Sequence, residues 1–72
     1  MNTLYELWST NAALDKLLLL FSNKSHDVAE SKAVNLHQET KRDIMLFNVV
    51  TGQPEMLFFS DETAKARSIL EG

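Results

Sequence analysis

Two apolar runs separated by a short polar segment constrain the fold of this chain more than any other feature of its sequence. Residues 44–50 and 56–59 are rich in Ile, Val, Leu, Met and Phe, and several of these types favour the pleated surface of a sheet. Between the runs, Gly52 can take the positive φ that a tight turn needs, and Pro54 removes a donor only where the second strand begins. The sequence therefore predicts a β-hairpin at about residues 44–59.

A hairpin of this composition needs cover. Both alternating sets of side chains in residues 44–50 are mostly apolar, and an isolated two-stranded sheet is only marginally stable. Lysine, which commonly protects sheet edges, is missing between Asp43 and Ser60. We therefore expect helices on the hairpin, together with either a third strand from residues 17–21 or pairing with a second subunit.

The N-terminal segment shows a helical pattern. Apolar residues from Leu4 to Phe21 recur mostly at spacings of three and four, and Thr3 with Glu6 forms a capping pattern. This predicts a helix running to about Ser22. The leucine run at residues 17–21 also fits a short buried strand, because five residues do not separate the two periodicities. Leucine is unbranched at Cβ and favours the helix.

Two further helices are expected. Asp27 and Glu30 form a capping pattern, so the second helix should start near residue 26. The segment from Ser60 to Thr63 places a cap residue and two acids at the positive end of a third helix, which should run from Glu62 to about Leu70. The second helix has a shallow apolar stripe, and small side chains allow a neighbouring element to approach closely. The stripe consists of Ala29, Ala33, Leu36 and Thr40.

These elements predict one small α+β domain over residues 1–72, a β-hairpin packed with two or three helices. The expected order is helix, helix, strand, strand, helix; if the leucine run is a strand, it is helix, strand, helix, strand, strand, helix. A domain of this length buries only about 60% of the surface of its unfolded chain. A homo-oligomer, with a dimer as its simplest form, is therefore expected.

Composition excludes several classes of function. The chain has no Cys, which argues against a disulfide scaffold or a thiolate site and favours the cytoplasm. The net charge of −3 has the wrong sign for general attraction to nucleic acid or anionic lipid. No signal peptide or membrane span is expected, and two Gly are too few for a glycine-rich phosphate loop.

Catalytic and metal-binding side chains are sparse. Ser25, His26 and Asp27 are the residue types of a hydrolase triad, but neighbours in the chain point apart and cannot converge. His26 and Glu30 could share an ion across one helical turn, whereas His37 would lie about 16 Å further along the axis than His26. The sequence therefore predicts no enzyme, no cofactor and no metal site.

What remains favours a protein that binds another protein, as an inhibitor, adaptor or regulatory accessory of the sort encoded by phage and other mobile elements. Its expected surfaces are an acidic group near the end of the hairpin and an aromatic pair one helical turn apart. The acidic group is Glu55, Asp61 and Glu62, and the aromatic pair is Tyr5 and Trp8.

Two alternative functions remain open. In a nucleic-acid-associated regulator, dimer symmetry would double the clustered bases into one stripe. Those bases are Lys41, Arg42, Lys65 and Arg67. Glu39 and Asp43 flank the first pair and weaken its field, so nucleic acid is not the expected partner. In a structural subunit of a larger assembly, the apolar hairpin would be buried by neighbouring chains.

Overall fold

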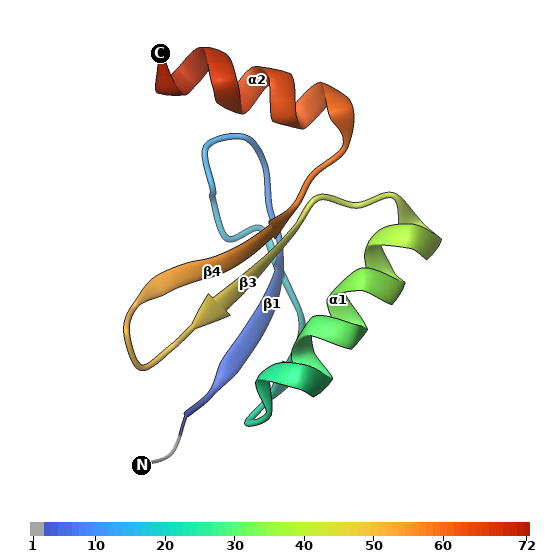
Figure 1. Ribbon diagram of the computed structural model, residues 1–72, viewed down its shortest axis with the longest axis vertical. Helices are drawn as coiled ribbons and strands as arrows, with labels where there is room; N and C mark the ends of the chain where they lie inside the picture. The colour runs from blue at the N-terminus through green and yellow to red at the C-terminus, as the bar shows by residue number, and fades with distance from the viewer. Residues whose placement is uncertain (1–2) are drawn as a thin grey trace.

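The computed structural model describes residues 3–72 and shows one antiparallel sheet with two helices, an α+β arrangement (Figure 1). In chain order the elements are β1 (Tyr5–Ser9), β2 (Leu18–Asn23), α1 (His26–Thr40), β3 (Ile44–Asn48), β4 (Gln53–Phe58) and α2 (Asp61–Glu71). Neither helix in this part of the chain has the length and apolar character needed to cross a membrane.

The four strands lie in the order β2-β1-β3-β4, and each neighbouring pair is antiparallel. The central strand β1 places Leu7 beside Phe21 of β2 and beside Leu46 of β3. Each outer pair has one irregularity in register; that in the β3–β4 pair leaves Glu55 without a cross-strand partner. The edges of the sheet are therefore β2 and β4.

The expected helix from Leu4 to Ser22 is wrong. This segment forms β1 and β2, joined by a loop at residues 10–17. The tertiary environment decides the outcome: Leu7 is fully buried on one face of the sheet, while its neighbour Trp8 lies on the other. The loop interrupts any helix, since the Asn11 side chain accepts hydrogen bonds from the Ala13 and Asp15 amides at 3.0 and 3.2 Å.

The expected order helix, helix, strand, strand, helix is therefore wrong, and the strand interpretation of the leucine run is confirmed. The alternative order was right about that run and wrong about the helix before it. The strand pairs with β1 rather than with the hairpin itself. The hairpin is confirmed as β3 and β4, with Gly52 at φ 70° in the turn, and both later helices form where they were expected.

The core lies between one sheet face and α1. Two helix alanines are fully buried there, and their small side chains bring the helix close to the strands, as the stripe predicted. The buried cluster consists of Leu7, Ala29, Ala33, Ile44 and Leu46, with Tyr5, Leu20, Phe21, Leu36, Met56 and Phe58 packed around it.

The opposite face of the sheet carries Trp8, Met45 and Phe47 and has no helix on it. The loop that joins β1 and β2 supplies partial cover: Lys16 places its Nζ 3.7 Å from the centre of the Phe47 ring and 5.4 Å from that of Trp8. The Trp8 indole donates a hydrogen bond to Glu6 Oε1 at 3.1 Å. The ammonium group of Lys16 and the carboxylate of Glu6 thus both contact the aromatic side chains on this face.

The last helix, α2, lies across one end of the sheet rather than on either face (Figure 1). Asp43 fixes its first turn, accepting hydrogen bonds from the Ser60 amide and the Thr63 hydroxyl, and Arg67 donates to the Ala12 carbonyl at 3.1 Å. Within residues 3–72, α2 packs against no strand and no other helix. Of the two helices within residues 3–72, only α1 covers the hairpin, so the expectation that two or three helices do so is wrong.

Candidate functional site

The outer edge of β2 is the most distinctive exposed feature of the molecule. From Leu17 to Asn23 the chain carries no charged side chain. Leu17, Leu18 and Leu19 are 58%, 52% and 47% exposed. An edge strand has backbone donors and acceptors that no neighbouring strand uses, and natural proteins usually protect such edges with charge, proline or cover. Here the edge is both apolar and open.

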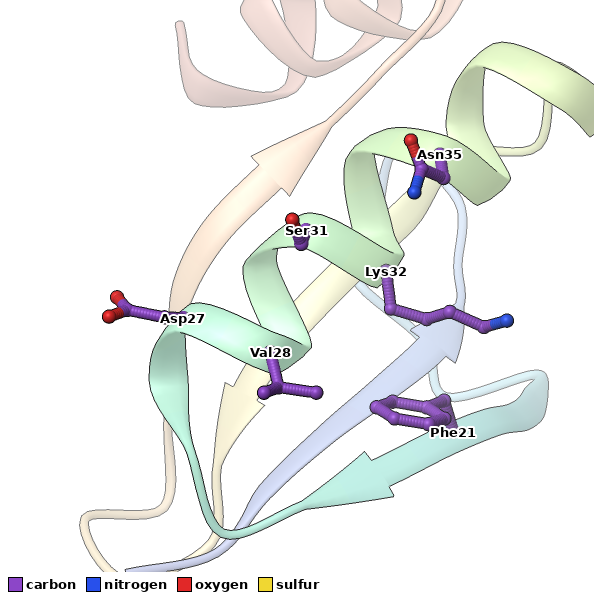
Figure 2. A pocket seen from close by; sticks show the side chains of 6 residues that line it. All are labelled: Phe21, Asp27, Val28, Ser31, Lys32 and Asn35. Atoms are coloured by element: carbon purple, nitrogen blue, oxygen red, sulfur yellow. The ribbon is translucent and has the colours of Figure 1, made fainter.

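An open groove of about 390 Å³ runs beside this edge, between β2 and α1 (Figure 2). Phe21 of β2 forms one side, and α1 forms the other with residues spaced along its exposed face. The lining residues are Phe21, Asp27, Val28, Ser31, Lys32 and Asn35. The groove combines an apolar floor, made by Phe21 and Val28, with polar groups along its helical side.

Lys32 gives the groove its positive charge. Its Nζ lies 5.7 Å from the centre of the Phe21 ring, so the side chain spans the space between helix and strand. Among residues 3–72 Lys32 makes no ion pair, whereas Asp27 at the other end of the groove has a fully exposed side chain. A ligand carboxylate near Lys32 would therefore meet an uncompensated ammonium group.

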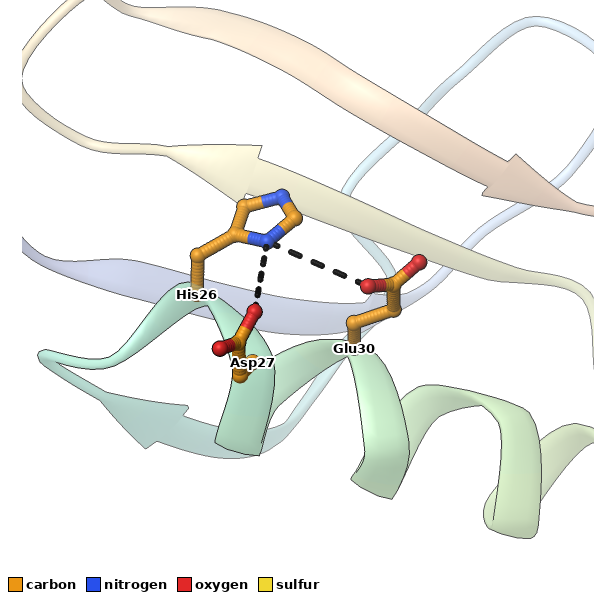
Figure 3. Close-up of side chains that lie close together, drawn as sticks. All are labelled: His26, Asp27 and Glu30. Carbon is orange, nitrogen blue, oxygen red and sulfur yellow. Dashed lines mark ion pairs between the residues drawn. The ribbon is translucent and has the colours of Figure 1, made fainter.

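A second group of polar side chains gathers around His26 at the start of α1 (Figure 3). His26 Nδ1 lies 4.0 Å from an oxygen of Asp27 and 4.0 Å from an oxygen of Glu30. Its other ring nitrogen, Nε2, lies 3.7 Å from Glu55 Oε1 on β4. The Tyr5 ring packs edge-on against the imidazole, with ring centres 5.1 Å apart. One imidazole thus lies among three carboxylates from two elements.

The acidic residues expected to form a patch are not brought together. Glu55 lies beside His26, near the turn that joins β3 and β4, whereas Asp61 and Glu62 lie in the first turn of α2, beyond the other end of β4. Tyr5 and Trp8 are also separated. In a strand, residues three apart point to opposite faces, so Tyr5 faces α1 and Trp8 faces the side of the sheet that carries no helix.

The clustered bases lie in two places. Lys41 and Arg42 directly follow α1, while Lys65 and Arg67 belong to α2. Arg67 is engaged, since its Nε lies 3.0 Å from Glu71 Oε1. His37, the second histidine, lies near the C-terminal end of α1, where its Nδ1 is 2.7 Å from the Arg42 carbonyl oxygen.

Sequence reasoning missed the edge of β2 and the proximity of Asp27 and Glu55 to His26. The uncharged run at residues 17–23 was a visible signal for the edge, but it was assigned to a helix. The sequence predicts a capping role for Asp27 and a side chain that points away from its neighbour His26, whereas its carboxylate lies 4.0 Å from His26 Nδ1. No local pattern could place Glu55, because β4 brings it to α1 across the sheet. Comparisons with protein-family models, curated proteins and solved structures find no match for this chain.

Proposed function

We propose that this chain acts without catalysis, as a regulatory or accessory protein that binds an extended segment of another protein by strand addition to the outer edge of β2. The observation that carries the proposal is the uncharged edge formed by β2 and the preceding Leu17, with Leu17, Leu18 and Leu19 about half exposed. In strand addition, main-chain hydrogen bonds supply affinity and pockets for alternate side chains supply specificity.

The groove beside β2 defines the chemistry of the segment. A strand added to this edge would project alternate side chains toward α1. An apolar side chain would pack on Phe21 and Val28, and a neighbouring carboxylate would reach Lys32. The partner segment is therefore extended, apolar at alternate positions and acidic at one of the positions that face the groove.

The other edge of the sheet is less suited to this role. β4 contains Pro54, which lacks a backbone donor, and Glu55, which interrupts the regular pairing with β3. Proline, charge and irregular register are the usual means by which an edge strand is kept from pairing. The two edges therefore differ in the way expected if β2 binds a partner and β4 does not.

The proposal is tested by selecting ten-residue peptides from a random display library on the immobilised full chain, then titrating the selected peptides into ¹⁵N-labelled protein. We expect alternating apolar residues with an acidic position, and amide shifts concentrated in β2 and the groove side of α1. Leu18→Lys should weaken binding at least about tenfold, because a lysine protects an edge. Val50→Lys is the matched control, since Val50 is 55% exposed in the β3–β4 turn.

Three results would count against the proposal. One is a library that yields no binders, and another is a shift pattern centred on Trp8 or α2. The third is equal binding by the two lysine variants. If β2 instead pairs with β2 of a second copy, the free protein would sediment as a dimer and Leu18→Lys would dissociate it. This result would show that the edge serves self-association and not the binding of another protein.

A further inference from the structure

We propose that the start of α1 binds a divalent transition-metal ion of the Zn²⁺ class, through His26 Nδ1 and the carboxylates of Asp27 and Glu30. These three side chains offer one nitrogen and two oxygen atoms that all lie within 4.8 Å of one another (Figure 3). Zn²⁺ is bound in proteins by histidine nitrogen and carboxylate oxygen, with three protein ligands and an open fourth position in sites that exchange water or substrate.

The separations are close to those a bound ion needs. Ligands about 2.0–2.1 Å from a tetrahedral Zn²⁺ are about 3.4 Å apart. Here Nδ1 lies 4.0 Å from each carboxylate oxygen, and all three donor atoms lie within 4.8 Å of one another. The Asp27 side chain is fully exposed and that of Glu30 is two-fifths exposed, so both can rotate to close the remaining gaps without disturbing the core. All three ligands come from one turn of one helix.

The second ring nitrogen of His26 carries the strongest part of the argument. A histidine that binds a metal usually directs its other nitrogen toward a carboxylate, which fixes the tautomer and orients the ring. Glu55 occupies this position, with Oε1 3.7 Å from Nε2. The amide of Asn48, a residue only 8% exposed, donates to the other Glu55 oxygen at 2.6 Å. The Tyr5 ring packs nearly perpendicular to the imidazole, and Nδ1 points toward Asp27 and Glu30 (Figure 3).

Charge also favours a cation here. Three carboxylates surround one imidazole, and within residues 3–72 none of them forms an ion pair with a lysine or an arginine. The partial positive charge at the N-terminus of α1 disfavours a bound cation. This repulsion is modest at an exposed helix end and is weaker than the attraction of two carboxylates in direct contact with the ion. The ligand atoms select the class of metal. An imidazole nitrogen suits Zn²⁺ and other first-row transition-metal ions, whereas Mg²⁺ prefers oxygen ligands alone.

The test is titration of the full chain with Zn²⁺, followed through the imidazole ¹⁵N resonances and by calorimetry. We expect the ring signals of His26 to shift while those of His37 stay unchanged. His26→Gln should abolish the calorimetric signal. His37→Gln should retain it, since His37 is the second histidine of the same helix, is likewise only partly exposed, and forms no ion pair with a carboxylate. An equal concentration of Mg²⁺ should not compete.

Glu55→Gln tests the positioning role separately, because this change leaves all three ligands in place. It should weaken Zn²⁺ binding about 10–100-fold, whereas Asp61→Asn on α2 should have no effect. Equal shifts of both histidines, or unchanged binding in His26→Gln, would overturn the site. Binding only at millimolar Zn²⁺ would indicate nonspecific adsorption to surface carboxylates and would also reject the proposed site. Leu18→Lys, which disables the proposed edge, should leave the metal titration unchanged.

Discussion

The Thr63 hydroxyl donates a 2.6 Å hydrogen bond to Asp43 Oδ2, joining the first turn of α2 to the segment that enters β3. The other carboxylate oxygen accepts from the Ser60 amide at 2.9 Å. Asp43 thus anchors the first turn of α2, a helix that packs against no strand within residues 3–72. Its negative charge lies at the N-terminal end of the helix, where the helix dipole favours an anion. Asp43 therefore fixes the start of α2, while the hydrogen bond from Arg67 to the Ala12 carbonyl holds the helix further along.

Replacing Asp43 should therefore release α2 selectively. In Asp43→Ala both hydrogen bonds are lost, and the free energy of opening α2 should fall by about 1–2 kcal/mol. A helix of 11 residues is marginal without such support. Hydrogen exchange should accelerate in α2 and remain slow in β1 and β3. Asp61→Asn is the control, and equal acceleration in both variants would contradict the assigned role.

Lys41 offers a route to higher stability. It ends α1 in the left-handed conformation, at φ 61° and ψ 15°. This conformation is energetically unfavourable for a residue that has a Cβ atom, whereas glycine adopts it readily. Lys41→Gly should raise the free energy of unfolding by about 0.5–1 kcal/mol in urea denaturation. Lys41→Ala removes the same charge and keeps the strain, so it should give no such gain. A larger gain from alanine would show that charge, not conformation, governs this position.

The close contact between α1 and the sheet can be tested at Ala33, which is fully buried. Ala33→Leu inserts three carbon atoms where helix and strands already touch, and it should lower the free energy of unfolding by about 1–3 kcal/mol. Ala66→Leu on the exposed surface of α2 provides the comparison and should be nearly neutral. A neutral result at Ala33, measured by urea denaturation, would mean that the helix lies further from the sheet than described.

Lys16 should stabilise the face of the sheet that carries no helix through its position over Phe47. Lys16→Met keeps most of the apolar stem and removes the charge, so the free energy of unfolding should fall by about 0.5–1 kcal/mol. Near-ultraviolet circular dichroism should report the altered surroundings of Trp8, which lies 5.4 Å from the same ammonium group. Lys24→Met serves as a charge-matched reference, and indistinguishable effects of the two substitutions would rule out the aromatic contact as the cause.

The C-terminal half of the fold could be predicted because its signals are local. Gly52 and Pro54 marked the turn region between two β-rich runs, and the stripe that includes Ala29 and Ala33 marked the buried side of α1. Ser60 and Thr63 likewise marked the start of α2. In each of these segments, local conformational preference and tertiary environment favour the same structure.

In the N-terminal half, β1 could not be predicted and β2 was predicted only as an alternative, because the local and tertiary preferences of these segments differ. Leucine-rich residues 18–21 favour a helix by themselves, and the spacing of Leu4, Leu7 and Trp8 is compatible with one. Pairing with β3 instead requires Leu7 and Trp8 to lie on opposite faces of a strand. That pairing is nonlocal, so no window of sequence around either strand contains it. The approach of Glu55 to His26 was hidden for the same reason.

The central position of β1 has a consequence for synthesis on the ribosome. β1 and β2 emerge first and can pair with each other, but the inward side of Leu7 stays uncovered until α1 and β3 have left the exit tunnel. At ordinary translation rates this interval lasts roughly 1–5 s, which is long compared with the microseconds that a hairpin needs to form. During synthesis the apolar side of Leu7 therefore stays exposed for seconds before the native core can form.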